Sequence, residues 1–420
     1  MNQSSSGFKS DNISTISLWL LASIMGTGYL GITIISPALG TITSYFETSE
    51  AKAQLLLSGF FLSMAIAQLI YGPLSDLYGR RPFLLIGLIL FSLGGLLAGL
   101  SQSMGMLVSA RIIQGLGAAA IVSIVRVIIN DTYNRLEGAS AFALMSMIMS
   151  IVPIISFVFG GLICDLIGWR GTMFLIFISG LLLLTIVFLT LPETNYNKNK
   201  DSHFITVFND YIILIKNKKF IAFMVSSSSC AGVFFTMIGF ISFEYSRTGA
   251  TASEIGFWFM LNPCGYILGN YITKRYVSRF GIEPMAQFGG CMCLVSVMSL
   301  LLPWALNLNN PFILSMSGML LGFASGFVIA NTTIGAMSSA GNSSGNASGI
   351  VGAAQMGFGI LGGAIVVNIG GYDHFERGVL VLIALSSISI VFSTISRRLK
   401  KTKCFRNCSQ FWQKSGLKDI

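Results

Sequence analysis

The chain has 420 residues, of which 53% are hydrophobic and only 10% are charged. Soluble domains carry about 25% charged residues, so this composition excludes a water-soluble protein and predicts that lipid surrounds most of the chain. The formal net charge is +10, and because the basic residues lie mainly in short loops and the C-terminal tail, it indicates membrane orientation and no nucleic-acid partner.

Twelve mainly apolar windows are long enough to cross a bilayer, which needs about 20 residues. The first six predicted spans are Ser14–Pro37, Ala53–Leu74, Phe83–Leu100, Met104–Ile129, Ala139–Ile163 and Thr172–Leu191. The last six are Phe220–Phe243, Ile255–Ile272, Pro284–Leu306, Pro311–Met337, Ala347–Ile369 and Gly378–Ile395. The sequence therefore predicts an all-α membrane protein with two six-helix bundles.

The polar connector between these bundles divides the chain into five predicted parts. They are an N-terminus at 1–13, a first bundle at 14–191, a linker at 192–219, a second bundle at 220–396 and a basic tail at 397–420. The middle of the linker, near His203 to Ile215, is expected to form an interfacial helix.

The Lys and Arg residues fall mostly on one side of the predicted membrane. An even number of spans puts both termini on the same side, and the opposite side carries only Lys52, Arg170, Arg247 and Arg377. Because positively charged loops stay in the cytoplasm, both termini and the linker are predicted to be cytoplasmic, in a bacterial inner membrane.

The loop after the second span carries a charged motif, Gly-Pro-Leu-Ser-Asp-Leu-Tyr-Gly-Arg-Arg-Pro, from Gly72 to Pro82. It resembles the signature of the major facilitator superfamily, which it matches at Gly72, Leu74, Asp76, Gly79, Arg80 and Arg81. Asp76 is placed to accept from Arg80 or to cap a neighbouring helix N-terminus. The resemblance implies the major facilitator fold and a latch that holds the halves together in the outward-facing state. The alternative is a plain basic turn that fixes topology.

The fourth span contains Arg111-Ile-Ile-Gln114-Gly-Leu-Gly-Ala-Ala, which resembles a signature of drug:proton antiporters. An Arg at the centre of a membrane helix costs about 2.5–3.5 kcal/mol, so Arg111 is expected to face the interior or a water-filled cavity. Snorkelling of Arg111 to the interface is the alternative. The end of this span, Arg126 to Asp131, is similar to the Bcr/CflA drug-efflux branch. Both residues are assigned to the latch, with a solvated helix end as the alternative.

The eleventh span opens with Gly-x-Ala-Ser at 345–348 and continues to Gln355, which also resembles the Bcr/CflA branch. Two positions depart from that branch. Thr33 stands where the branch carries an acidic residue in the first span. Ser156-Phe157 replaces a Gly-Pro pair of the antiporter motif in the fifth span.

No carboxylate or imidazole is predicted to lie at mid-membrane, because all sixteen Asp and Glu and both His fall in loops, termini or span ends. Proton-coupled transporters normally carry such a group inside the membrane. Coupling is therefore expected from Glu47, Glu50, Asp131 or Glu244 at a span end, or to be weak or indirect.

Polar residues inside spans are the candidates for a substrate cavity between the halves. They are Tyr29, Thr33, Arg111, Gln114, Asn262, Asn331 and Gln355. One Arg and no acid predict a neutral or weakly positive pocket. Neutral, zwitterionic or anionic substrates are then favoured over lipophilic cations.

The leading hypothesis is a monomeric exporter of drug-like or amphiphilic small molecules, with the proton as coupling ion and membrane lipid as its surroundings. The alternatives are an exporter of an endogenous metabolite such as a siderophore, and a non-transporting receptor on the same scaffold. A membrane enzyme is disfavoured because no nucleophile–base pair or carboxylate cluster falls within the spans. The seven scattered cysteines are interpreted as free thiols, and no metal or cofactor is expected.

Overall fold

The computed structural model describes residues 17–133, 135–195, 204–306, 310–341 and 344–414. The expected N-terminal segment 1–13, residues 196–203 of the expected linker and residues 415–420 of the expected tail lie outside the described residues. All regular structure within the described ranges is helical, which confirms the all-α class.

The elements follow the predicted spans closely. The first half contains α1 (Leu18–Thr33), η1 (Ser36–Ala38), α2 (Leu39–Tyr45), α3 (Glu50–Ala53), α4 (Leu55–Tyr78), α5 (Arg80–Gly99), α6 (Met104–Thr132), α7 (Arg135–Ile167) and α8 (Trp169–Thr190). The linker forms α9 (Phe204–Lys216), so the expected helix at this place is present. The second half contains α10 (Lys218–Arg247), α11 (Ala252–Phe259), α12 (Leu261–Phe280), α13 (Ile282–Ser299), α14 (Leu301–Ala305), α15 (Pro311–Ser339), α16 (Ser344–Asn368) and α17 (Phe375–Lys414).

Eleven helical segments of the described chain are long and apolar enough to cross a membrane. The remaining expected span, Ile255–Ile272, is divided between α11 and α12, which meet at Met260. The end of α12 is basic, with Lys274, Arg275 and Arg279. The count of twelve crossings stays a prediction at this segment.

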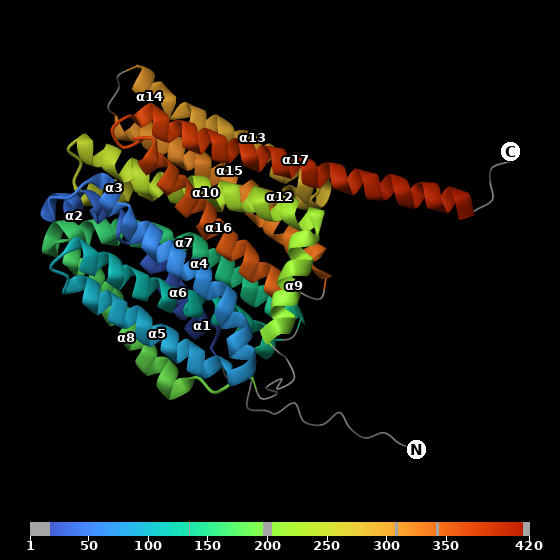
Figure 1. Ribbon diagram of the computed structural model, residues 1–420, viewed down its shortest axis with the longest axis horizontal. Helices are drawn as coiled ribbons and strands as arrows, with labels where there is room; N and C mark the ends of the chain where they lie inside the picture. The colour runs from blue at the N-terminus through green and yellow to red at the C-terminus, as the bar shows by residue number, and fades with distance from the viewer. Residues whose placement is uncertain (1–16, 134, 196–203, 307–309, 342–343, 415–420) are drawn as a thin grey trace.

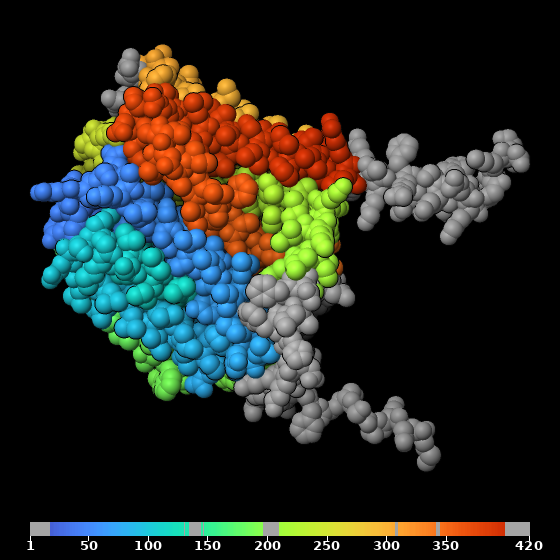
Figure 2. All heavy atoms as spheres, in the orientation of Figure 1, coloured from blue at the N-terminus to red at the C-terminus, as the bar shows by residue number. Residues whose placement is uncertain are grey.

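The helices form two groups that face each other (Figure 1). Helices α1 and α4–α8 pack together on one side, α10, α12, α13, α15 and α17 on the other, and α16 lies between them against α4. The linker helix α9 contacts α4, α10 and α16, and Figure 2 shows it beside α16. We call the end of the molecule with α9, Gly79 and Glu193 the linker face, and the end with Glu50 and Arg247 the distal face.

Glycines allow the helices of the first half to approach closely. A Cβ on Gly87 of α5 would lie 2.5 Å from the Cβ of Ala120 on α6, and a Cβ on Gly117 of α6 would collide with the backbone of Phe91. Small residues drive this kind of close packing in membranes, where lipid tails compete for apolar contacts. The many glycines of the sequence therefore have a packing role here.

Candidate functional site

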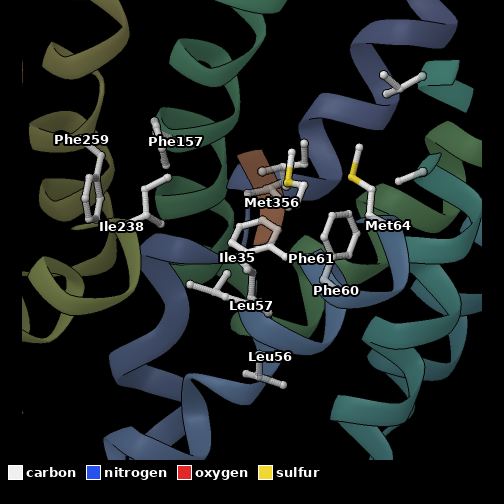
Figure 3. Close-up of a cluster of buried hydrophobic side chains, with 14 of the residues drawn as sticks. Ile35, Leu56, Leu57, Phe60, Phe61, Met64, Phe157, Ile238, Phe259 and Met356 are labelled. Carbon is white, nitrogen blue, oxygen red and sulfur yellow. The ribbon is translucent and has the colours of Figure 1, made fainter. Parts of the chain in front are cut away.

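Apolar side chains from both halves pack into one buried cluster (Figure 3). Its labelled members come from five helices and from the turn before η1: Ile35, Leu56, Leu57, Phe60, Phe61, Met64, Phe157, Ile238, Phe259 and Met356. The rings of Phe157 on α7 and Phe259 on α11 stack with centroids 5.2 Å apart, and Phe61 on α4 meets Phe235 on α10 at 4.8 Å. These contacts join the two halves without any charged group.

Polar contacts between the halves close the distal face. The carboxylate of Asp165 on α7 accepts from the backbone N–H groups of Ala252 (3.1 Å) and Ser253 (2.8 Å) at the start of α11. Arg247 on α10 pairs with Glu50 on α3 at 2.8 Å. An anion at a helix N-terminus and a cross-half ion pair both stabilise this closed arrangement.

Gln54, which lies between α3 and α4 of the first half, makes a further contact at the distal face. Its side chain inserts into the second half. Its side-chain oxygen accepts from the hydroxyl of Tyr372 at 2.9 Å, and both residues are buried. The amide fits because Gly239 and Gly363 lack side chains: a Cβ at Gly363 would lie 2.5 Å from its nitrogen. Removing either partner would leave a buried polar group unpaired, which costs about 1–3 kcal/mol.

At the linker face, the charged motif is organised around Arg80 within the first half. The buried guanidinium pairs with Asp76, donates to Asp131 at 2.9 Å and donates to the hydroxyl of Ser75 at 2.8 Å. Burial raises the pKa of Asp131, although Arg80 acts in the opposite direction. The expected latch residues Asp76, Arg80 and Asp131 are thus brought together, and Ser75 is a member that sequence reasoning missed.

The turn at Gly79 is built around a second missed residue, Glu193. Its carboxylate accepts from the backbone N–H groups of Arg80 (2.8 Å) and Arg81 (3.2 Å) at the start of α5. Gly79 has φ of +114°, and a Cβ there would lie 2.5 Å from Glu193. The guanidinium of Arg81 donates to the carbonyl of Phe188. A carboxylate after the sixth predicted span was the available sequence signal for this cap.

Arg111 is fully buried inside the first half and does not snorkel. Its guanidinium donates to the carbonyls of Gly31 (3.0 Å) and Leu56 (3.4 Å), pairs with Gln114 and lies over the ring of Phe60 at 4.2 Å. These partners come from α1, α4 and α6. In this conformation Arg111 joins three helices rather than facing open space.

Arg126 lies apart from the Arg80 group, with which it was expected to act. Its guanidinium donates to the hydroxyl of Tyr29 on α1 at 3.3 Å. Across the interface, Tyr266 of α12 hydrogen-bonds to the side chain of Asn270, and its phenol lies near that of Tyr29. These four half-buried residues, which we call the central polar group, come from both halves.

The other expected cavity residues are placed as follows. Thr33 hydrogen-bonds to Ser156 of α7, so the two positions that depart from the branch pattern contact each other. Asn262 and Asn331 are buried and donate to the carbonyls of Gly318 and Phe327, both at 2.8 Å. Gln355 is half-buried and donates to Ser227 at 3.0 Å. Tyr29 and Gln355 therefore retain exposed surface, whereas the rest of this set is buried.

Acidic residues avoid the middle of the membrane-spanning helices. Outside α9, every described Asp and Glu lies within a turn of a helix end or in a connection. In α9, burial raises the pKa of Tyr211 to about 12, and this phenol donates to the carbonyl of Leu69 at 3.0 Å. Asp210 accepts from Asn346 of α16 at 3.0 Å, so α9 is bonded to both halves.

Comparison with known proteins identifies relatives along most of the chain. A family model described as Major Facilitator Superfamily matches residues 21–364. The chain is 25% identical over 346 residues to the bicyclomycin resistance protein homolog of Haemophilus influenzae, covering 81% of this chain and 85% of that one. It is also 25% identical over 355 residues to multidrug resistance protein D of Escherichia coli, covering 82% and 86%.

Solved structures with similar folds include a D-xylose–proton symporter, with a TM-score of 0.71, 16% identity and coverage of 90% of this chain and 96% of that one. Another is a bacterial homologue of the human lysosomal transporter Spinster in an inward-facing and occupied conformation. Its TM-score is 0.70, with 16% identity and coverage of 93% and 98%. At this identity the likeness shows the fold alone.

Proposed function

We propose, from the premise that this chain belongs to the Major Facilitator Superfamily, that it exports drug-like or amphiphilic small molecules by alternating access. Membership confirms the major facilitator fold and a transporter rather than an enzyme. The similarity to proteins named for bicyclomycin and multidrug resistance supports export of drug-like compounds, as the Bcr/CflA resemblance implied. Bacterial relatives support placement in an inner membrane.

The observation that carries this proposal is the unequal closure of the two faces. In the described chain, the ion pair of Arg247 with Glu50 and the bonds of Asp165 to α11 join the halves at the distal face. At the linker face the Arg80 cluster lies entirely within the first half, and the hydrogen bonds that reach both halves come from the linker helix α9. Alternating access requires two states that are closed at opposite faces, and this arrangement corresponds to the state closed at the distal face.

We further propose that the linker face is cytoplasmic. The excess of Lys and Arg in its loops supports this orientation. The state would then be inward-facing, with the linker and both termini in the cytoplasm. An impermeant thiol reagent applied to intact cells should label a cysteine introduced at Lys52 and fail to label one introduced at Lys218. Labelling of the Lys218 position alone would reverse the assignment.

The latch at Asp76 would act in the opposite, outward-facing state. The Asp76 side chain is 49% exposed, and a Cβ on Gly72 would meet no atom within 4 Å. Both lie at the end of α4, which packs against α16. Closing the linker face would bring this carboxylate toward the N-terminus of α16, where the helix dipole favours an anion. Asp131 would act through Arg80.

Proton coupling would use carboxylates at the two faces, because the described spans carry none at their centres. The candidates that contact an arginine are Asp131 at the linker face, and Glu50 and Glu244 at the distal face. Protonation of any of them would weaken an ion pair that belongs to one end state. Coupling would then act on the closure of a face rather than on the substrate.

Transport in proteoliposomes with an imposed pH gradient tests the proposal. The purified full-length chain should transport radiolabelled chloramphenicol in exchange for protons that move down the imposed gradient. Arg111→Ala should abolish this gradient-dependent transport, because it removes the contacts that join α1, α4 and α6. Arg275→Gln, at an exposed position on α12, is the matched control for loss of a positive charge. Binding without net flux would identify a receptor. Flux at the same rate with and without the pH gradient would refute proton coupling but would not contradict export.

A further inference from the structure

The two arginines of α6 have very different surroundings. Arg111 is buried and its donors are occupied by two carbonyls and by Gln114. Arg126 is half-buried, and within the described residues its one hydrogen-bond partner is the neutral hydroxyl of Tyr29. None of the described ion pairs includes Arg126. The exposed donors of Arg126 therefore lack an anion.

An arginine in this environment is adapted to bind an acidic group. A guanidinium presents five N–H donors in a planar fork, and it matches a carboxylate through two parallel hydrogen bonds. A cation within a membrane-spanning bundle is costly unless an anion, a carbonyl or water compensates it. Since Tyr29 occupies only one donor direction, the remaining donors are available to a ligand that enters between the halves.

The residues across the interface complete the site. Tyr266 and Asn270 of α12 are hydrogen-bonded to each other and lie near Tyr29. They add one hydroxyl group and one amide to the hydroxyl of Tyr29 and the guanidinium of Arg126, and none of these four residues is acidic.

We infer that the central polar group binds the carboxylate of an amphiphilic substrate, with Arg126 as the residue that determines specificity for a negative charge. This inference rests on the proposed function, since it names the substrate class of the same path. It assigns recognition to Arg126 rather than to Arg111, whose donors are used to join helices. The hydroxyls of Tyr29 and Tyr266 and the amide of Asn270 then orient the bound carboxylate.

Binding to the purified full-length chain tests this directly with three probes that share one ring system. Naphthylacetate is an anion, naphthylacetamide is its neutral analogue and naphthylethylammonium is a cation. Wild type should bind naphthylacetate about tenfold or more tightly than either other probe, because a charge-assisted bidentate pair is the difference. Equal binding of all three, preference for the cation, or no binding of naphthylacetate at millimolar concentration would overturn the inference.

Variants of Arg126 test whether this residue causes the preference for the anionic probe. Arg126→Gln should remove the preference for naphthylacetate and leave the affinity for naphthylacetamide within about twofold. Arg126→Lys should retain part of it, since the charge remains and the fork geometry is lost. Arg275→Gln is the matched surface control, and the thermal midpoint of each variant verifies folding. Unchanged preference in a folded Arg126→Gln would overturn the assignment, and wild-type probe ranking tests the substrate class even where that variant misfolds.

Flux of the same probes in proteoliposomes separates this inference from the proposed function. Charge-ranked binding without any flux would refute export while the site stands. Flux of the neutral and cationic probes without charge-ranked binding would refute the site while export stands.

Discussion

At the scale of single residues, Gly72 and Gly79 of the charged motif have opposite requirements. Gly79 has φ of +114° and a Cβ there would lie 2.5 Å from Glu193, whereas Gly72 is helical with open space around it. We expect Gly79→Ala to lower stability by about 1–3 kcal/mol, because it strains the backbone and displaces the cap. Gly72→Ala should leave stability unchanged or raised by about 0.5 kcal/mol, because Ala favours helix. Thermal unfolding in detergent measures both.

The transport activity of Gly72→Ala should change even though its stability does not fall. If the latch closes against α16 in the outward-facing state, this stable variant should lose flux, since the added methyl group would occupy the closing surface. A stable Gly72→Ala that transports normally would contradict the proposed role of Gly72.

The raised pKa of Asp131 predicts a pH-dependent stability. A carboxyl whose pKa is higher in the folded than in the unfolded protein binds its proton more tightly when folded, so its contribution is greatest at acidic pH and is lost as pH rises through that value. Wild type should therefore lose stability relative to Asp131→Asn as the pH rises above the ordinary Asp pKa of about 4. Thermal midpoints across this range test the sign, and a wild-type midpoint that rises relative to that of Asp131→Asn as the pH increases would contradict it. Asp76→Asn, on the same guanidinium, is the matched comparison.

At the scale of elements, the N-terminus of α11 is capped from within and from across the interface. Thr251 and Glu254 form a capping box inside the second half, and Asp165 of the first half accepts from two further N–H groups. Removing either cap should cost about 1 kcal/mol. Only Asp165→Asn should also increase opening of the distal face, because Glu254 makes no contact across the halves in this cap.

Labelling of a cysteine introduced at Ser253 by an impermeant thiol reagent measures that opening. The rate should rise in Asp165→Asn and stay unchanged in Glu254→Gln. Equal labelling of the two variants would show that Asp165 acts only as a local cap.

The elements themselves were largely predictable, and the exception is instructive. Hydropathy alone predicted eleven membrane-crossing segments, since a lipid environment requires long apolar stretches. Of these, the last differs most, because α17 continues past the predicted end at Ile395 to Lys414. The span predicted at Ile255–Ile272 is instead α11 and α12. The division at Met260 coincides with Pro263, which has no N–H to donate to the carbonyl of Phe259, and α11 and α12 then pack against α7 and α15 respectively.

At the scale of the whole molecule, a disulfide cross-link should hold the distal face in its closed state. A Cβ on Gly40 of α2 would lie 3.0 Å from the Cβ of Ser246 on α10, near the separation of about 3.8 Å found in disulfides. The double variant Gly40→Cys and Ser246→Cys should cross-link on oxidation and stop transport, because the halves could no longer separate there. Reductant should restore flux, and each single variant is a control. Undiminished flux in a fully cross-linked sample would refute alternating access through this face.

The sequence by itself determined the membrane class, the two-part organisation, the orientation signal and the pairing of Asp76 with Arg80, because hydropathy, loop charge and short-range spacing are local properties. Asp131, 51 residues from Arg80, was assigned to this group only through the family resemblance. Only the tertiary structure decided the partners of the buried polar groups. The sequence predicted that Arg111 lines the substrate cavity and that Arg126 belongs to the latch. In the structure, Arg111 contacts three helices of one half and Arg126 contacts Tyr29. A buried polar side chain must find a partner wherever the packed helices present one, and that choice is made by contacts between segments distant in the chain.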